Sequence, residues 1–383
     1  MSLEYIQSLS NDRQELANLV IECDSSVSSS ATFTELINKL NTLDFIYPLS
    51  YITKAYSTET ELDMTKYPIT RVNSLAECFY SCYNLTTLNV DTWNTSHITN
   101  LVGTFAYDNK LTSLNMIKHW DVSNVTDMAG LFDRCNNITD WSGIQNWNTN
   151  NLQRISNIFT NCKQLTEAPG VINSWNLSKL QNCTNAFFNC NSLTTANFSN
   201  RNLANLVNMA DTFRACANLT DVNFYNTNFN NLQDIAYLFS GCGNLVNLNL
   251  KWTGNAPLTN LMYTFASCGN LTSIDVGHFN TKNVESVYEC FYRCNNLVTI
   301  NGILNWDNSS MKTLYYTFGS CNNLSEQTKA DIYNMLPPAS QLYDPYIAYM
   351  GFNVLNLSYT HLWLLNNKGY VDAAAPVYNV SIT

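Results

Sequence analysis

A short phrase, F-x-x-C-x-N-L-T, recurs through the middle of the chain and limits its fold more than any other feature. The phenylalanines that open its ten copies follow one another at intervals of 26 to 28 residues. They are Phe79, Phe105, Phe132, Phe159, Phe187, Phe213, Phe239, Phe265, Phe291 and Phe318. A fixed period of this length indicates a solenoid, in which each coil buries its apolar face by stacking on its neighbours.

One unit of the repeat, residues 105–131, contains two kinds of periodicity. Residues 111–116 alternate between apolar and polar after the first step, which predicts a short strand. Residues 125–132 carry apolar side chains three and four positions apart, which predicts one or two helical turns. Strand, corner, short helix and corner is the plan of a leucine-rich repeat. We therefore expect an α/β solenoid of about ten coils of 26–28 residues, with a parallel sheet on one face.

The array is expected to cover residues 73–324 and to be flanked by segments of a different kind. Residues 46–72 contain two prolines and no clear period, which predicts an irregular connector that caps the N-terminal end. A helical pattern from Leu324 to Leu336 stops before two further prolines. Because the end of a solenoid must cover an apolar surface, residues 325–383 are predicted to form the C-terminal cap.

The first 45 residues predict a helical hairpin that precedes the array. Helix-capping patterns open two stretches, 12–23 and 33–43, and each carries one apolar stripe. A serine-rich turn separates the two stretches. Two such short helices bury too little surface to be stable alone. We therefore expect residues 1–45 to pack against copies of themselves or against a partner.

Cysteines follow nine of the ten phenylalanines at a distance of three residues, and Asp108 takes this place in the second copy. Equivalent residues of neighbouring coils stack about 4.8 Å apart, within disulfide reach, but their side chains point in parallel. The pattern predicts a reduced column of small buried side chains. The close pairs Cys78/Cys82 and Cys290/Cys294 have no second pair or histidine nearby in the sequence. We expect neither a metal site nor another cofactor.

Two further columns repeat once in most coils. An asparagine just before each strand is predicted to be buried and to hydrogen-bond the turning backbone of its own and adjacent coils. These residues are Asn84, Asn137, Asn218, Asn244, Asn270, Asn296 and Asn323. An aromatic column is predicted to form a structural stack at a corner. It contains Trp93, Trp120, Trp147, Trp175, Phe229, Trp252, Phe279 and Trp306.

The candidate binding site is the outward face of the strands, where one polar residue recurs per coil. Its members are Asn89, Asn115, Asn197, Asn223, Asn249, Asp275 and Asn301, with Tyr225 and Lys251 at the edge. A ribbon of amides with nearby aromatics suits hydroxyl-rich ligands such as glycans, and repeat surfaces suit extended partners. The alternative is that asparagine simply tolerates the solvated face of a parallel sheet.

Charge and motif content exclude several classes of function. Only 13% of the residues are charged and the net charge is −10, so we expect no nucleic-acid partner. No apolar run is long enough for membrane insertion. The four histidines, His97, His119, His278 and His361, lie at unrelated phases of the repeat and outside any catalytic motif. We expect no enzymatic activity, although distant coils could still assemble a carboxylate pair of the kind that glycan hydrolases use.

The repeat phrase resembles the BspA-like leucine-rich repeat. Residues 79–90, 93–96 and 120–128 match the pattern best, and the resemblance extends over about 73–324. Members of that family are mostly bacterial surface adhesins, and similar repeats occur in bacteriophage virion proteins. The resemblance therefore implies a leucine-rich-repeat fold and an adhesive role.

The N-terminal segment is similar to the hairpin that begins many phage tail and baseplate proteins. Residues 13–19 and 31–40 carry this likeness, but residues 22–24 stand where those proteins usually have a glycine turn. The first residues also lack the basic start and apolar core of a signal peptide, which a surface adhesin would normally carry.

Taken together, these features predict a non-enzymatic virion protein of a bacteriophage tail, baseplate or fibre, made in the host cytoplasm. Residues 1–45 would bind other virion proteins, and the repeat face would bind a host surface protein or glycan. The resemblance to tail proteins also implies a homo-oligomer, a trimer or a hexamer. Two alternatives stay open: a structural protein that stabilises the virion, and a cellular BspA-like protein at the bacterial surface or inside the cell.

Overall fold

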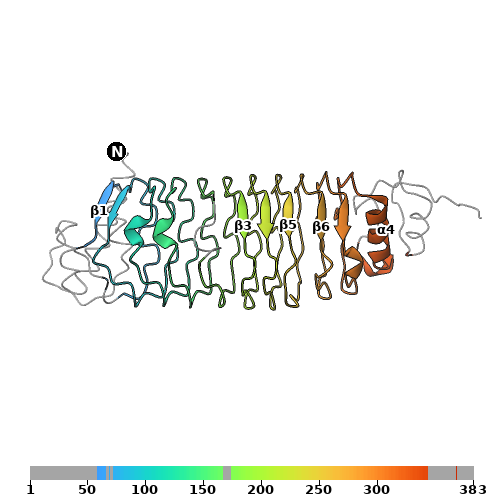
Figure 1. Cartoon of the computed structure of the whole chain (residues 1–383), viewed down its shortest axis with the longest axis horizontal. Helices are drawn as coiled ribbons and strands as arrows, with labels where there is room; N and C mark the ends of the chain where they lie inside the picture. Colours follow the sequence, from blue (N-terminus) through green and yellow to red (C-terminus); the bar gives the residue numbers. More distant parts are fainter. Residues whose placement is uncertain (1–57, 66–68, 70–71, 167–173, 344–367, 369–383) are drawn as a thin grey trace, which may run out of the picture.

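The computed structural model describes residues 58–65, 69, 72–166, 174–343 and 368. Over these residues the chain winds into a long stack of coils, with short strands aligned on one face (Figure 1). The predicted solenoid with a parallel sheet is confirmed. The predicted hairpin in residues 1–45 lies outside the described residues.

The strands are three residues long and pair in parallel between successive coils. They are β1 (Glu61–Asp63), β2 (Thr87–Asn89), β3 (Thr195–Asn197), β4 (Asp221–Asn223), β5 (Asn247–Asn249), β6 (Ser273–Asp275) and β7 (Thr299–Asn301). The sheet orders are β1-β2, β3-β4-β5 and β6-β7. In most of these strands the middle side chain is buried and the outer two point away from the core. This is the alternation that a half-buried strand requires.

The strand β1 lies in the segment that we expected to be an irregular connector. It pairs in register with β2, from Glu61 opposite Thr87 to Asp63 opposite Asn89. No F-x-x-C phrase precedes β1, and only one of its three residues is apolar, so the repeat pattern does not reveal it. The described sheet therefore begins before residue 73.

Residues 111–116, predicted as a strand, form a different structure. Ser113 makes an isolated parallel bridge to Asp140, and the chain then enters a 3₁₀ turn, η1 (Asn115–Ile117). Leu114 and Ile117 are both fully buried, and a spacing of three residues suits a 3₁₀ turn rather than a strand. The next coil repeats this arrangement with η2 (Ser142–Ile144).

The helical turns predicted for residues 125–132 are also wrong. The backbone N–H of Leu131 donates to the carbonyl of Met128 over 3.2 Å, and that of Cys135 donates to Phe132 over 3.1 Å. These bonds close two successive four-residue β-turns instead of a helix. Two such turns bury side chains at spacings of three and four, so their sequence pattern equals that of a helix.

The turns leave alternate backbone N–H groups for the neighbouring coil. Gly130 donates to the carbonyl of Ser156 over 2.8 Å, and Phe132 donates to Ile158 over 3.0 Å. An α-helix would satisfy these groups within its own segment. Here each coil depends on the next coil for its hydrogen bonds as well as for its apolar contacts.

The phenylalanines and cysteines of the repeated F-x-x-C phrase are buried in the centre of the stack. We call this column the Phe–Cys spine. All nine pairs of successive spine phenylalanines stack, with centroids 5.2 to 6.0 Å apart. From Cys135 onward, each spine cysteine donates its S–H to the carbonyl of the preceding coil's phenylalanine, as Cys216 does to Phe187 over 3.0 Å. The twelve cysteines in the described part of the chain are unbridged, which confirms the reduced column.

The predicted helix at the C-terminal end of the array is present as α4 (Glu326–Met335). Ser325 caps it by accepting a hydrogen bond from the backbone N–H of Thr328, and Thr328 bonds to the carbonyl of Val298 in the last coils. Two short 3₁₀ turns, η3 (Ile303–Asn305) and η4 (Ala339–Gln341), lie before and after it. The helix therefore covers the end of the stack that the strands leave exposed (Figure 1).

Each pair of turns places two residues in the left-handed region, four positions apart. Gly241 occupies one such position with φ of 81°, whereas Ala215 occupies the equivalent position of the preceding coil with φ of 60°. A left-handed backbone costs a residue with a Cβ roughly 1–2 kcal/mol. We expect Ala215→Gly to raise the free energy of unfolding by about 1 kcal/mol in urea titration. Ala204→Gly, at a position without positive φ, is the control and should lower it.

Candidate functional site

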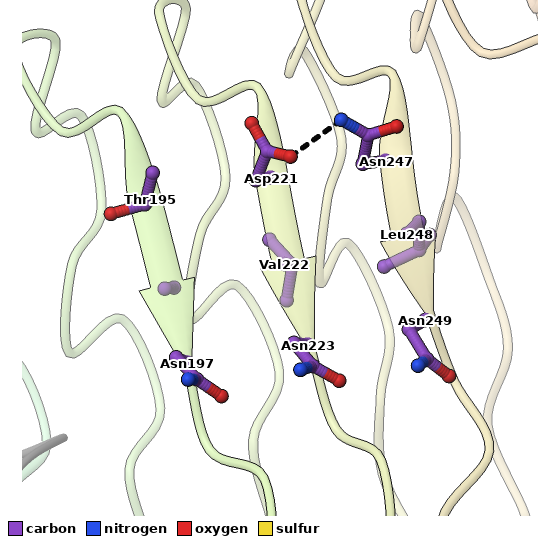
Figure 2. Close-up of a pocket in the computed structure, with 9 residues that line it drawn as sticks. Thr195, Asn197, Asp221, Val222, Asn223, Asn247, Leu248 and Asn249 are labelled. Atoms are coloured by element: carbon purple, nitrogen blue, oxygen red, sulfur yellow. Dashed lines mark hydrogen bonds between the residues drawn. The ribbon is translucent and has the colours of Figure 1, made fainter.

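A shallow groove of about 440 Å³ crosses the outward face of β3, β4 and β5 (Figure 2). Two rows of polar side chains form its walls, because the first and third residues of each strand point outward. Ala196, Val222 and Leu248, the middle residues of the three strands, form its floor. The groove therefore runs across the strands, along the axis of the solenoid.

Three asparagines, one from each strand, form the first wall. The backbone N–H groups of residues 199, 225 and 251 donate to the Oδ1 atoms of Asn197, Asn223 and Asn249 over 3.0, 2.9 and 3.1 Å. Each asparagine thus ends its strand with an Asx turn. The oxygen of each amide accepts the hydrogen bond of the turn. The Nδ2 group faces solvent and has no protein partner in the described structure.

Thr195, Asp221 and Asn247 form the second wall. Asn247 donates from Nδ2 to one carboxylate oxygen of Asp221, and the hydroxyl of Thr220 donates to the other over 2.6 Å. The Asn247 amide therefore presents its oxygen, and the Thr195 hydroxyl is exposed. This wall mainly offers hydrogen-bond acceptors and a hydroxyl. Sequence reasoning missed these three residues, although the period of two along each strand already places them outward.

Tyr225 and Lys251, the two residues predicted at the edge of the polar face, follow β4 and β5 and do not line the groove itself. The Asx turns position them, because each follows the groove asparagine of its own strand by two residues. Tyr225 is 53% exposed and Lys251 is also exposed. They place one aromatic ring and one positive charge beside the asparagine wall.

The remaining predicted residues lie farther along the same face. Asn89 and Asp275 end their strands with the same Asx turn, accepting from the N–H groups of Asp91 and Gly277. Asn301 is the exposed last residue of β7. Asn115 is exposed but begins η1 instead of ending a strand, so it does not extend the strand row. The groove brings together only the three asparagines of β3, β4 and β5.

The tryptophan column is a buried structural stack, as expected, and cannot contact a ligand on the strand face. Trp93 and Trp120 stack at 6.1 Å, and both are at most 4% exposed. The indole N–H groups of Trp93, Trp175 and Trp306 donate to backbone carbonyls of the preceding coil. Within the groove region, Tyr225 supplies the aromatic surface.

The asparagine column before the strands makes the predicted contacts between coils but is exposed rather than buried. Asn137 donates from Nδ2 to the carbonyl of Asn109, and Asn218 donates to that of Asn191 over 2.7 Å. The side chain stays at the surface because the carbonyl that it reaches lies at an outer corner of the coil.

A second row of aromatic side chains follows the turns of the later coils. Tyr237 and Tyr263 stack at 4.5 Å, Tyr288 lies 5.3 Å from Tyr263, and Tyr315 lies 5.2 Å from Tyr288. The guanidinium of Arg214 covers the outer face of Tyr237 at 4.6 Å. Tyr237 stacks on Tyr263, and Tyr288 stacks on Tyr315, so each of these rings has one face covered by another ring.

The thiols of the spine have low nucleophilic reactivity. Burial raises the pKa of Cys216 and of Cys268 to about 12. Because the thiolate is the nucleophile, thiols with such a pKa are inert at neutral pH. Among the residues that the structure describes, no three His, Cys, Asp or Glu side chains form a metal-binding group.

The histidines of the described chain take part in contacts between coils. His97 and His119 each place a ring nitrogen next to a carbonyl of the preceding coil, Ile69 at 2.8 Å and Val90 at 3.3 Å. His278 packs edge-on against Trp252.

In the described part of the chain, no helix has the length and apolar character that crossing a bilayer requires.

Repeated coils with parallel strands on one face and a buried Phe–Cys spine define a leucine-rich-repeat solenoid. A family model described as "Mycoplasma protein of unknown function, DUF285" matches residues 48–168, 73–200, 166–265 and 207–331. The matched segments together extend over most of the chain. The protein therefore belongs to the DUF285 family.

Solved structures of bacterial leucine-rich-repeat proteins are similar to this chain at low identity. The protein from T. pallidum shares 17% identity over 55% of this chain and 71% of its own, with a TM-score of 0.30. The protein from Bacteroides ovatus shares 16% over 65% and 74%, with a TM-score of 0.27. That from Eubacterium ventriosum shares 16% over 69% and 77%, with a TM-score of 0.30. No curated protein sequence matches the chain.

Proposed function

We propose that this protein is a non-enzymatic adhesin whose strand face binds a receptor, a protein or a glycan, on a cell surface. The observation that carries the proposal is the groove over β3–β5, where a row of amide groups faces solvent without protein partners. Polar groups arranged in this way provide many weak and directional contacts. The unreactive buried thiols and the histidines that contact neighbouring coils favour a binding function over catalysis.

The setting that we propose is a bacteriophage virion, in which residues 1–45 attach the protein to other tail or baseplate subunits as a trimer or hexamer. The likeness of residues 1–45 to tail-protein hairpins supports this setting. Antibody-labelled electron micrographs would show the protein on particles, and mass photometry would give the number of subunits. Normal incorporation of the chain lacking residues 1–45 would contradict the attachment role.

The bacterial cell surface is an equally supported setting for the same adhesive function, because the repeat phrase resembles BspA-like adhesins. In that case the antibody would label the cell envelope and not particles. A structural role in the virion is the remaining alternative. It predicts incorporation into particles without binding of the purified protein to any cell.

Tyr225 provides a direct test of the adhesive function. We expect Tyr225→Ala to weaken binding of the full-length protein to receptive bacterial cells by about tenfold, since truncation of an aromatic residue that carries binding energy costs more than about 1 kcal/mol. Flow cytometry with labelled protein over a panel of strains would measure this. Tyr343→Ala is the control, because Tyr343 is 75% exposed and lies beyond α4. The absence of binding to every strain, or equal binding by both variants, would contradict the proposal.

A further inference from the structure

The two walls of the groove differ in the hydrogen-bonding groups that they present. Figure 2 shows the amides of Asn197, Asn223 and Asn249 projecting in parallel, with the nitrogen on the same side in all three. Their orientation is fixed, because each Oδ1 accepts the backbone N–H of an Asx turn. One wall therefore presents a row of N–H donors.

The opposite wall presents the complementary groups. The Thr195 hydroxyl can donate or accept, and the Asn247 oxygen can accept because its nitrogen is bonded to Asp221. Hydroxyl groups both donate and accept, so a polyhydroxylated ligand satisfies both walls at once. A ligand with acceptors only would satisfy the asparagine wall and leave the other wall unsatisfied.

The repeat distance along the groove selects among linear polymers. Paired parallel strands lie about 4.8 Å apart, so equivalent donors recur at that distance along the axis. This distance is close to the length of one pyranose in an extended chain. An extended peptide repeats every two residues, roughly 6.8 Å, so its side chains no longer match the spacing of the coils after two coils. A nucleic acid would meet a protein with a net charge of −10.

We propose that the groove over β3–β5 binds a linear glycan that lies along the solenoid axis, with one sugar for each coil. Oxygen atoms of successive sugars accept hydrogen bonds from Asn197, Asn223 and Asn249, and their hydroxyls bond to Thr195 and Asn247. Tyr225 packs against a sugar at the edge. This assignment rests on the adhesive function proposed above and names the class of its receptor.

Asparagine-to-aspartate changes test the donor wall without removing the Asx turns. Asp275 already forms this turn at the equivalent position of β6, so Asn197→Asp, Asn223→Asp and Asn249→Asp together keep the backbone and remove three donor groups. The full-length protein would be applied to an array of purified bacterial capsular and O-chain polysaccharides. We expect the triple variant to bind the recognised polysaccharide at least tenfold more weakly.

A second triple variant controls for the three added negative charges. Asn94, Asn148 and Asn202 are exposed and accept the same type of Asx hydrogen bond at corners away from the groove. Their change to aspartate should leave polysaccharide binding within twofold of the unchanged protein. Urea unfolding of both variants would verify that the fold is intact. Equal loss of binding in both triple variants, or no loss in either variant, would overturn the assignment of the groove.

The length of the ligand gives an independent measurement. Oligosaccharides cut from the recognised polysaccharide should bind far more tightly as trisaccharides than as disaccharides in calorimetric titration, because the third sugar reaches the third coil. Equal affinity for the two lengths would contradict one sugar per coil.

Treatment of the cells separates failure of this inference from failure of the adhesive function. Periodate, which cleaves sugar diols, should abolish binding of the full-length protein to receptive cells, and protease treatment should not. Loss after protease alone, with no polysaccharide bound on the array, would show a protein receptor and overturn the glycan inference while the adhesive function stands. Binding to no cell would overturn both.

Discussion

Replacing Asp108 with cysteine is expected to raise the free energy of unfolding by about 1–3 kcal/mol at pH 4, the usual cost of an unsatisfied buried polar group. Asp108 is fully buried in the Phe–Cys spine, and its carboxyl oxygens make no close hydrogen bond; a backbone contact with Cys82 only partly opposes the effect of burial on its pKa. A cysteine there would donate its S–H to the preceding coil, as Cys135 does to Phe105. Urea unfolding followed by circular dichroism measures the gain.

The gain should increase with pH. Burial raises the pKa of Asp108 well above its ordinary value of 3.8, so the folded protein keeps a proton that the unfolded chain releases. The unmodified protein therefore loses stability as pH rises above about 4, by at most about 1.4 kcal/mol per pH unit, until the folded pKa is passed. The Asp108→Cys variant lacks this loss. The half-buried Asp133, whose pKa burial raises to about 6, is present in both proteins and cancels in the difference.

The exposed Asp91 supplies the control for this comparison. Asp91→Asn should change the free energy of unfolding by no more than about 0.5 kcal/mol, as is usual for surface substitutions. A destabilising effect of Asp108→Cys, or a gain that stays constant between pH 4 and pH 8, would show that the carboxyl group is accommodated in its ionised form.

Phe213→Ala is expected to lower the free energy of unfolding by about 3–5 kcal/mol, the range for removal of a buried aromatic ring. Phe213 is fully buried and stacks on Phe187 at 5.4 Å and Phe239 at 5.8 Å. Because each coil contacts mainly its neighbours, the cavity weakens the coupling between the two halves of the array. Thermal unfolding should lose its single sharp transition.

Phe188→Ala is the matched control, because Phe188 belongs to a neighbouring coil but is only partly buried. It should cost less than about 1 kcal/mol. If Phe213→Ala costs no more than Phe188→Ala, the spine does not carry the stability of the array.

The sequence pattern predicted the architecture well and its local geometry less well. The period of the phenylalanines identifies a solenoid because equivalent positions must stack in every coil. The same pattern could not distinguish a helix from two β-turns, since both bury residues such as Met128, Leu131, Phe132 and Cys135 on one side. The choice depends on whether alternate N–H groups find carbonyls in the next coil, which is a property of the assembled stack.

The candidate site was predicted in part for a similar reason. Alternation along the strand places Asn197, Asn223 and Asn249 on the outer face, and the structure confirms this location. The sequence does not state which amide atom faces outward, because that depends on the backbone N–H two residues later. Asn115 also follows an apolar residue at the equivalent point of the repeat but lies in η1, where Ile117 is buried.

The exchange of backbone hydrogen bonds between coils also affects how such a protein can evolve. Since the described coils offer similar sets of donors and acceptors to their neighbours, a tandem duplication of one repeat in the gene would insert between existing coils without a new kind of interface. Each insertion would add one rung to the Phe–Cys spine and one amide to the strand face. The length of ligand that the surface can hold would then change in steps of one subsite, while the chemistry of recognition stays constant.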